Sequence, residues 1–167
     1  MGFCSNYYAT SLLPANNGTV FVNYYNNKFT TIQNLLKDKG YYVFSMHGND
    51  GDFWNRNIMH QNMGYDKYYS KNSFLIDEEY GLGLSDKSFF RQAVPKIKKI
   101  STEHKNFYGT LIMLTNHTPF SDTDKYGEFD VSLKETVTNE NGESETKTYP
   151  YMEDTKLGNY FKSVHYA

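Results

Sequence analysis

The stretch YYVFSM, residues 41–46, runs directly into HGNDGDFWNRN, residues 47–57. Its nearly continuous apolar character is typical of a β-strand that is covered on both faces of a sheet. The following residues combine Gly, Asp and Asn with a histidine, an arginine and the only tryptophan of the chain. We therefore expect a buried strand whose end delivers His47 into a polar loop.

Regular elements are predicted on both sides of this strand. Residues 30–39, TTIQNLLKDK, place Ile32, Leu35 and Leu36 on one helical face behind a threonine cap, and Gly40 stands where a left-handed residue ends a helix. Residues 53–63 predict a short helix that is stopped by a glycine, and residues 65–70 predict a short strand.

A longer helix is predicted over residues 85–100, capped by Ser85 and kinked at Pro95. Its inward face is expected to consist of Phe89, Phe90, Ala93, Val94 and Ile97. Residues 107–114, FYGTLIML, predict a second buried strand, which ends in TNHTPF. Two buried strands with intervening helices indicate the α/β class.

The last part of the chain predicts two further elements. A polar β-hairpin is expected near residues 129–151, because an Asn141-Gly142 step lies between arms rich in Thr and Val. Residues 154–167 predict a final amphipathic helix with its apolar stripe at Leu157, Tyr160, Phe161 and Val164. Residues 1–167 are interpreted as a single partial domain.

Composition excludes some classes of function. The chain has 17 Lys and Arg against 19 Asp and Glu, which disfavours nucleic acid as a partner. Its 16 Tyr hint at a wet surface that handles sugars or polyols. No stretch reaches the roughly 20 apolar residues of a membrane span, so no membrane segment is expected. The single cysteine, Cys4, makes no internal disulfide and has no paired base that would make it a nucleophile.

Both predicted buried strands end in loops that contain histidine. Ligands of open α/β sheets bind beyond the carboxyl ends of the strands, so His47, Trp54, Arg56 and His117 would share one mouth if the two strands are close. The Arg56 fork matches a phosphate, the histidines can donate to oxygen, and Trp54 offers a flat wall to a small polyol. The alternatives are a structural role for each histidine and a core position for Trp54.

The other polar residues are interpreted more simply. Asp50 and Asp52 could be metal ligands, but Asp52 is favoured as the N-cap of the helix that follows. The remaining histidines, His60, His104 and His165, are interpreted as structural or surface residues.

Four segments, GYYVFSMHGNDGDFWNRNIMHQNMGYDKYY, GLGLSDKSFF, TLIMLTNHTPF and YFKSVHYA, resemble in this order the extracellular catalytic domain of lipoteichoic acid synthases and related phosphoglycerol transferases. The resemblance implies an alkaline phosphatase/sulfatase-like α/β/α sandwich, of which this chain is an internal fragment. It also implies that His47, Trp54, Arg56 and His117 contact glycerol phosphate.

The resemblance further implies a reaction and a place. The family uses a threonine nucleophile and a divalent metal, usually manganese, to move glycerol phosphate from phosphatidylglycerol to a teichoic acid chain at the extracellular face of the membrane. The nucleophile and the metal ligands cannot be assigned in this chain, and Thr10 lies too late to be the nucleophile. The chain by itself is therefore expected to bind no metal and to be inactive.

Alternative functions are a non-catalytic module that binds glycerol phosphate or teichoic acid, a phosphoethanolamine transferase, and a sulfatase or phosphodiesterase. Self-association through exposed sheet edges is also expected.

Overall fold

The computed structural model describes residues 20–120, 123–125 and 129–167, so Cys4 and Thr10 lie outside the described residues. The chain divides into two compact units after Leu114. The prediction of a single partial domain stays a prediction, and each unit is described by itself.

The first unit contains α2 (Val20–Asn23), α3 (Ile32–Asp38), β1 (Tyr42–His47), the 3-10 helix η1 (Phe53–Asn55), α4 (Arg56–Asn62), β2 (Lys67–Tyr69), the 3-10 helix η2 (Lys71–Ser73), β3 (Glu79–Tyr80), β4 (Gly83–Leu84), α5 (Asp86–Glu103) and β5 (Phe107–Ile112). The second unit contains the 3-10 helix η3 (Thr123–Lys125), β6 (Leu133–Thr138), β7 (Ser144–Tyr149) and α6 (Lys156–Tyr166). The predicted mixture of helices and strands, and hence the α/β class, is confirmed.

A parallel three-stranded sheet, in the order β2-β1-β5, organises the first unit. The predicted strand over residues 41–46 is β1, and five of its six residues are buried. The predicted second strand is β5, but all six of its residues are half-buried, so the prediction that it is buried is wrong. Among the described residues β5 is an edge strand with a neighbouring strand on one side only, and this explains its greater exposure.

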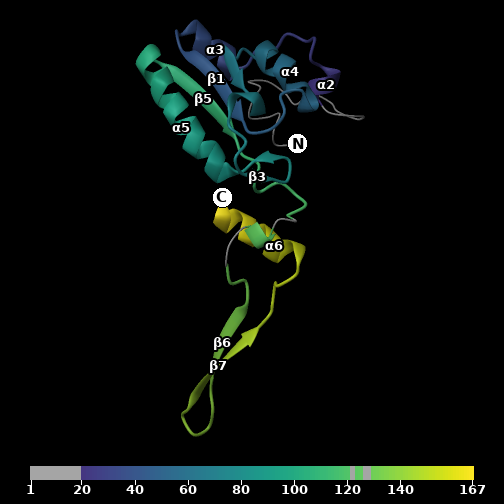
Figure 1. The fold of residues 1–167 in the computed structure, drawn as a ribbon, viewed down its shortest axis with the longest axis vertical. Helices are drawn as coiled ribbons and strands as arrows, with labels where there is room; N and C mark the ends of the chain where they lie inside the picture. Colours follow the sequence, from purple (N-terminus) through teal and green to yellow (C-terminus); the bar gives the residue numbers. More distant parts are fainter. Residues whose placement is uncertain (1–19, 121–122, 126–128) are drawn as a thin grey trace. The chain divides into compact units, whose positions relative to one another are not determined.

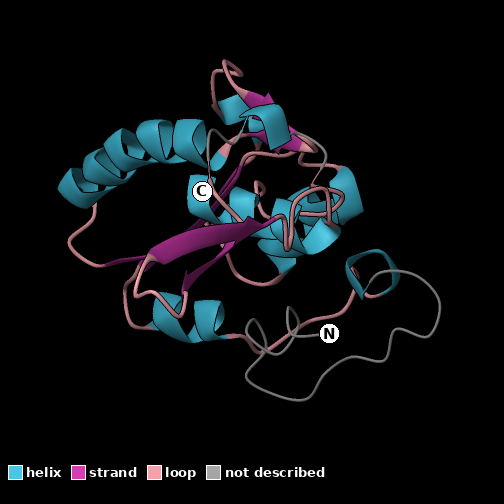
Figure 2. Cartoon of the chain, turned by 90° about the horizontal axis from the view of Figure 1, so that it is seen from below, coloured by secondary structure: helices cyan, strands magenta, loops and turns pink. Residues whose placement is uncertain are grey.

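Helices cover both faces of this sheet (Figures 1 and 2). Successive strand side chains point to opposite faces, so Val43 and Phe44 of β1 enter different clusters. Val43 packs with Met59 and Met63 from the α4 region. Phe44 packs with residues of α5, including Phe89, Ala93 and Ile100. Fully burying each such side chain contributes about 1.5–3 kcal/mol, so these clusters hold β1 between two helical layers.

The predicted helix over residues 30–39 is α3, and its cap is confirmed. The Thr31 hydroxyl accepts a hydrogen bond from the Asn34 amide, and Gly40 has a φ of 80°. The predicted face is wrong in part, because Leu36 packs on the core whereas Ile32 and Leu35 are exposed. Gln33 is buried instead, since its amide donates to the Tyr65 hydroxyl at 2.9 Å and so retains a hydrogen bond.

The predicted helix over residues 85–100 is α5. The Ser85 side chain accepts from the Ser88 amide, which confirms the cap, and the helix continues through Pro95. Among the predicted inward residues, Phe89 and Ala93 are buried and Phe90 and Ile97 are half-buried. Val94 is 59% exposed, so its predicted place in the core is wrong. After Ala93, the next buried residue of α5 is Ile100. Val94 lies beside the helix face that contacts the sheet, not on it.

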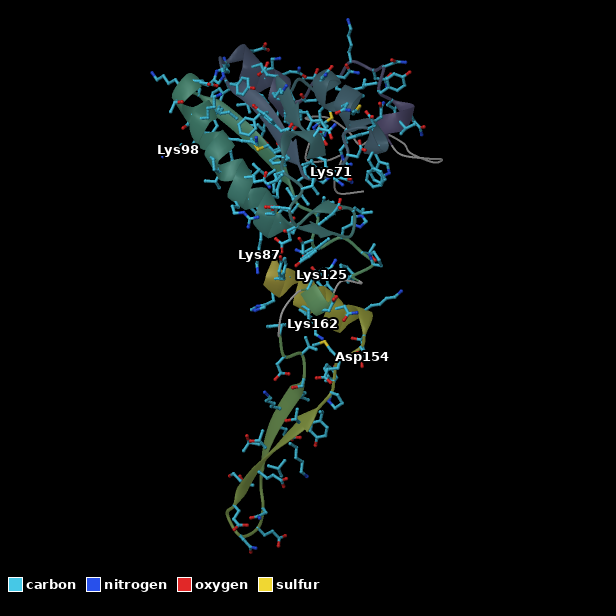
Figure 3. All side chains as sticks on the ribbon, viewed as in Figure 1. Lys71, Lys87, Lys98, Lys125, Asp154 and Lys162 are labelled. Atoms are coloured by element: carbon cyan, nitrogen blue, oxygen red, sulfur yellow. The ribbon has the colours of Figure 1, made fainter. Side chains whose placement is uncertain are left out.

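The second unit contains the predicted hairpin. Strands β6 and β7 pair antiparallel around a loop in which Gly142 has a φ of 81°, and all twelve strand residues are exposed. Their side chains stand out from the ribbon (Figure 3).

The last helix, α6, turns a different face inward from the predicted one. The four residues of its predicted apolar stripe are exposed: Leu157, Tyr160, Phe161 and Val164. Gly158, Ser163 and Tyr166 are buried instead. A β-carbon on Gly158 would lie 2.0 Å from the Met152 carbonyl oxygen, so this glycine permits the close approach that selects the face. Among the described residues, no helix combines the length and the apolar character needed to span a membrane.

Strands β2 and β5 form the two edges of the parallel sheet within the described residues. Unpaired backbone groups on such edges are templates for pairing with another chain. We therefore expect the sedimentation coefficient of this chain to rise with protein concentration as dimers or larger species form. A single monomeric species over the whole concentration series would contradict the expectation.

Candidate functional site

His47 ends the central strand. It is buried, and its neighbour in the register of β5 is Ile112. Its Nδ1 lies 2.8 Å from the Ile112 carbonyl oxygen. Because a carbonyl can only accept, Nδ1 carries the proton and Nε2 is the ring nitrogen that can accept in the neutral form. The adjacent parallel pairing of β1 and β5 confirms that the two strands preceding the histidine loops are neighbours.

The loop after His47 is tightly folded by its own polar groups. The Asp52 amide donates to the Asp50 carboxylate at 2.9 Å, and the Asp52 carboxylate accepts from the Asn57 side chain at 2.6 Å. A β-carbon on Gly51 would lie 2.2 Å from Asn57 Oδ1, so a larger residue there would displace the Asn57 side chain from its bond to Asp52. Asp52 occupies the N-cap position of η1 as predicted, but its side chain makes no capping hydrogen bond, and α4 itself is preceded by Asn55. The Asp52 carboxylate is used to close the loop instead.

Two consecutive residues, Trp54 and Asn55, have left-handed backbone conformations with φ of 56° and 58°. The predicted helix over residues 53–63 is therefore interrupted, and α4 begins only at Arg56. Such conformations cost energy for residues other than glycine and are frequent at functional sites. The break leaves Trp54 47% exposed while Arg56 is only 6% exposed.

Arg56 is held by aromatic rings. Its guanidinium carbon lies 5.5 Å from the Phe53 ring centroid and 5.2 Å from that of Trp54. The two rings stack at 5.3 Å with an interplanar angle of 25°. Arg56 Nη1 also donates to the Phe53 carbonyl at 3.1 Å. The structure thus brings Trp54 and Arg56 together, and the core position considered for Trp54 is excluded by its exposure.

A second buried histidine lies one helical turn after Arg56. His60 Nδ1 is 2.7 Å from the Ser45 hydroxyl of β1. Burial lowers the pKa of His60 to about 3, and electrostatic interactions with Arg56 and His47 act in the same direction. His60 is therefore neutral and structural, as predicted, but sequence reasoning missed that it lies beside Arg56. The spacing of four residues within one helix was the available signal.

The remaining histidines lie far from the His47–His60 segment in sequence. His104 stacks on Tyr42 with ring centroids 3.9 Å apart, and His165 stacks on Phe129 at 4.3 Å, so both have structural contacts. His117 is exposed in the second unit, with Nδ1 2.6 Å from the Thr118 carbonyl oxygen. Its convergence with the other three site residues therefore stays a prediction.

The implied divalent metal has no matching ligand set in the part of the chain that the structure describes, where no group of three or more His, Cys, Asp or Glu could hold an ion. Asp50 and Asp52 are not joined by a third such ligand among those residues. The carboxylate of Asp50 accepts the Asp52 amide, so a turn explains this pair without a metal.

Known proteins are similar to this chain in sequence and in fold. The family model described as Sulfatase matches residues 6–167. Lipoteichoic acid synthase 1 of Bacillus subtilis (strain 168) is 34% identical over 154 residues, covering 90% of this chain and 23% of that protein. Lipoteichoic acid synthase of Staphylococcus aureus (strain USA300) is 33% identical over 114 residues, covering 66% of this chain and 17% of that protein.

Solved structures agree on the fold. The crystal structure of the lipoteichoic acid synthase LtaP from Listeria monocytogenes has a TM-score of 0.79 at 28% identity, covering 98% of this chain and 35% of that one. The Streptococcus pyogenes phosphoglycerol transferase GacH, in complex with sn-glycerol-1-phosphate, has a TM-score of 0.54 at 18% identity and is similar in fold alone, with 92% of this chain and 36% of that one covered. The chain spans only part of each of these proteins.

The buried, neutral state of His60 predicts a pH effect on stability. Because its pKa falls from 6.5 to about 3 on folding, its contribution is complete above pH 6.5 and is lost as the pH falls towards 3. We expect the free energy of unfolding of wild type to fall relative to that of His60→Gln by up to about 1.4 kcal/mol per pH unit below pH 6.5. Urea unfolding at pH 7, 6 and 5 measures this, and parallel curves for the two proteins would contradict it.

Proposed function

The chain belongs to the sulfatase family, and from that premise we propose that it is the substrate-recognition part of a phosphoglycerol transferase. The proposed reaction moves glycerol phosphate from phosphatidylglycerol to a teichoic acid polymer at the extracellular face of the membrane. Its support in sequence is the similarity to lipoteichoic acid synthases over most of this chain.

The observation that carries the proposal is the Arg56 guanidinium, buried and held against Phe53 and Trp54. A guanidinium presents paired donors that match two oxygens of a phosphate. A guanidinium that is already held in place loses little conformational entropy when the anion binds. The fixed position thus favours an anion of defined geometry over a diffuse negative charge.

Trp54 complements this charge. Its ring is half exposed beside Arg56, and the left-handed backbone at Trp54 and Asn55 prevents it from turning into a regular helix face. A flat, exposed ring next to an anion-binding group suits the carbon backbone of a small polyol. Phosphate at Arg56 and glycerol against Trp54 together describe glycerol phosphate.

The two histidines have proposed roles at the ends of their strands. His47 is fixed by its bond to the Ile112 carbonyl, which directs the other ring nitrogen away from β5. His117 is proposed as a further phosphate contact because it follows the adjacent parallel strand in sequence. The implied divalent metal would supply Lewis-acid activation of the nucleophile, from residues not assigned in this chain.

Binding of sn-glycerol-1-phosphate by calorimetry tests the proposal. Arg56→Ala is expected to weaken binding by at least about tenfold, because one charge-assisted contact or more is lost. Arg91→Ala is the matched control, since Arg91 is an exposed arginine of α5 that pairs with Asp77. Circular dichroism confirms that each variant is folded. Equal affinities for wild type and Arg56→Ala would overturn the proposal.

A further inference from the structure

Tyr68 lies on the face of the sheet that carries the candidate site. It is paired with Ser45 in the register between β1 and β2, and neighbouring residues in parallel register point to the same face. Its ring centroid lies 4.5 Å from that of His60. The Ser45 hydroxyl holds the same imidazole from the other strand at 2.7 Å. Ser45, His60 and Tyr68 therefore form one layer between the sheet and α4, in which Ser45 and His60 are buried and Tyr68 is half-buried.

The Tyr68 hydroxyl is buried, yet it forms no hydrogen bond with any described residue. Leaving such a group unsatisfied costs about 1–3 kcal/mol, so a buried hydroxyl of this kind needs an explanation. Its neighbour Tyr65 shows the ordinary arrangement, because that hydroxyl bonds both Gln33 and Thr110.

Two charged residues act electrostatically on Tyr68. Burial raises the pKa of Tyr68 to about 12, and Arg56 acts to lower it while Asp50 acts to raise it. Both charged residues belong to the segment that includes the candidate site. The hydroxyl thus stays protonated at neutral pH, and a phenol oxygen can accept from a guanidinium, which can only donate.

We propose that Tyr68 is a positioning residue for Arg56: when an anion binds, the buried Tyr68 hydroxyl accepts a hydrogen bond from the guanidinium and holds the fork against the ligand. This inference rests on the proposed function, because it concerns the same anion site. It assigns Tyr68 a role that acts through Arg56 and requires no contact between Tyr68 and the ligand.

The substitution Tyr68→Phe separates this role from packing, because it keeps the ring on His60 and removes only the oxygen. A purely structural hydroxyl with no partner gives an unchanged or more stable protein and unchanged binding. The proposed role gives unchanged or higher stability without ligand, together with affinity for sn-glycerol-1-phosphate that is about three- to tenfold weaker. Weaker binding without any loss of stability is therefore the signature.

A matched control lies next in the same strand. Tyr69 points to the opposite face, where its ring meets the Phe44 ring edge-on at 6.4 Å, so Tyr69→Phe is expected to bind like wild type. In an Arg56→Lys background, Tyr68→Phe is expected to change affinity less than about twofold, because the planar fork that it positions is gone.

Calorimetric titration of wild type and these variants with sn-glycerol-1-phosphate, alongside their thermal unfolding, gives distinct outcomes. The inference is supported if Tyr68→Phe weakens binding in the wild-type background but has no such effect in the Arg56→Lys background. Unchanged binding by Tyr68→Phe while Arg56→Ala binds weakly overturns the inference and leaves the proposed function standing. An equal loss in both backgrounds also overturns it. Absent wild-type binding, or no effect of Arg56→Ala, overturns the proposed function and this inference with it.

Discussion

The parallel pairing of β1 with β5 is the constraint on which the candidate site depends. Six consecutive residue pairs, from Tyr42 with Phe107 to His47 with Ile112, bring together the ends of two strands that are far apart in sequence. The bond from His47 Nδ1 to the Ile112 carbonyl closes this pairing at its carboxyl end. The loop that carries Trp54 and Arg56 begins directly after it, so the position of both residues follows from the sheet.

The two faces of β1 have different physical characters. Phe44 and Met46 enter an apolar cluster with α5, whose stability depends on burial and close packing. On the other face Val43 also enters an apolar cluster, but buried hydrogen bonds lie beside it: Ser45 bonds His60, and Tyr65 bonds Gln33 and Thr110. Hydrogen bonds in such a polar layer are directional, so it can hold a side chain such as His60 in one orientation. The polar layer lies under the helix that begins at Arg56.

The arginine is also constrained by the residues that precede it. Phe53 and Trp54 stack beside its guanidinium, and the left-handed residues at Trp54 and Asn55 separate this pair from α4. Backbone strain, aromatic stacking and a buried polar layer thus act on one short segment. This concentration of costly features distinguishes the segment from an ordinary loop.

Local patterns in the sequence by themselves determined the β1 strand, the Thr31 and Ser85 caps and the hairpin at Asn141-Gly142, whereas the four candidate site residues stay a prediction. These features depend on neighbours within a few residues, where periodicity and capping chemistry decide. The tertiary structure alone decided that Val94 and the apolar stripe of α6 are exposed, because the buried face of a helix depends on what packs against it. It alone placed His60 and Tyr68 together on one face, since that contact joins a helix to a strand whose register no local pattern encodes.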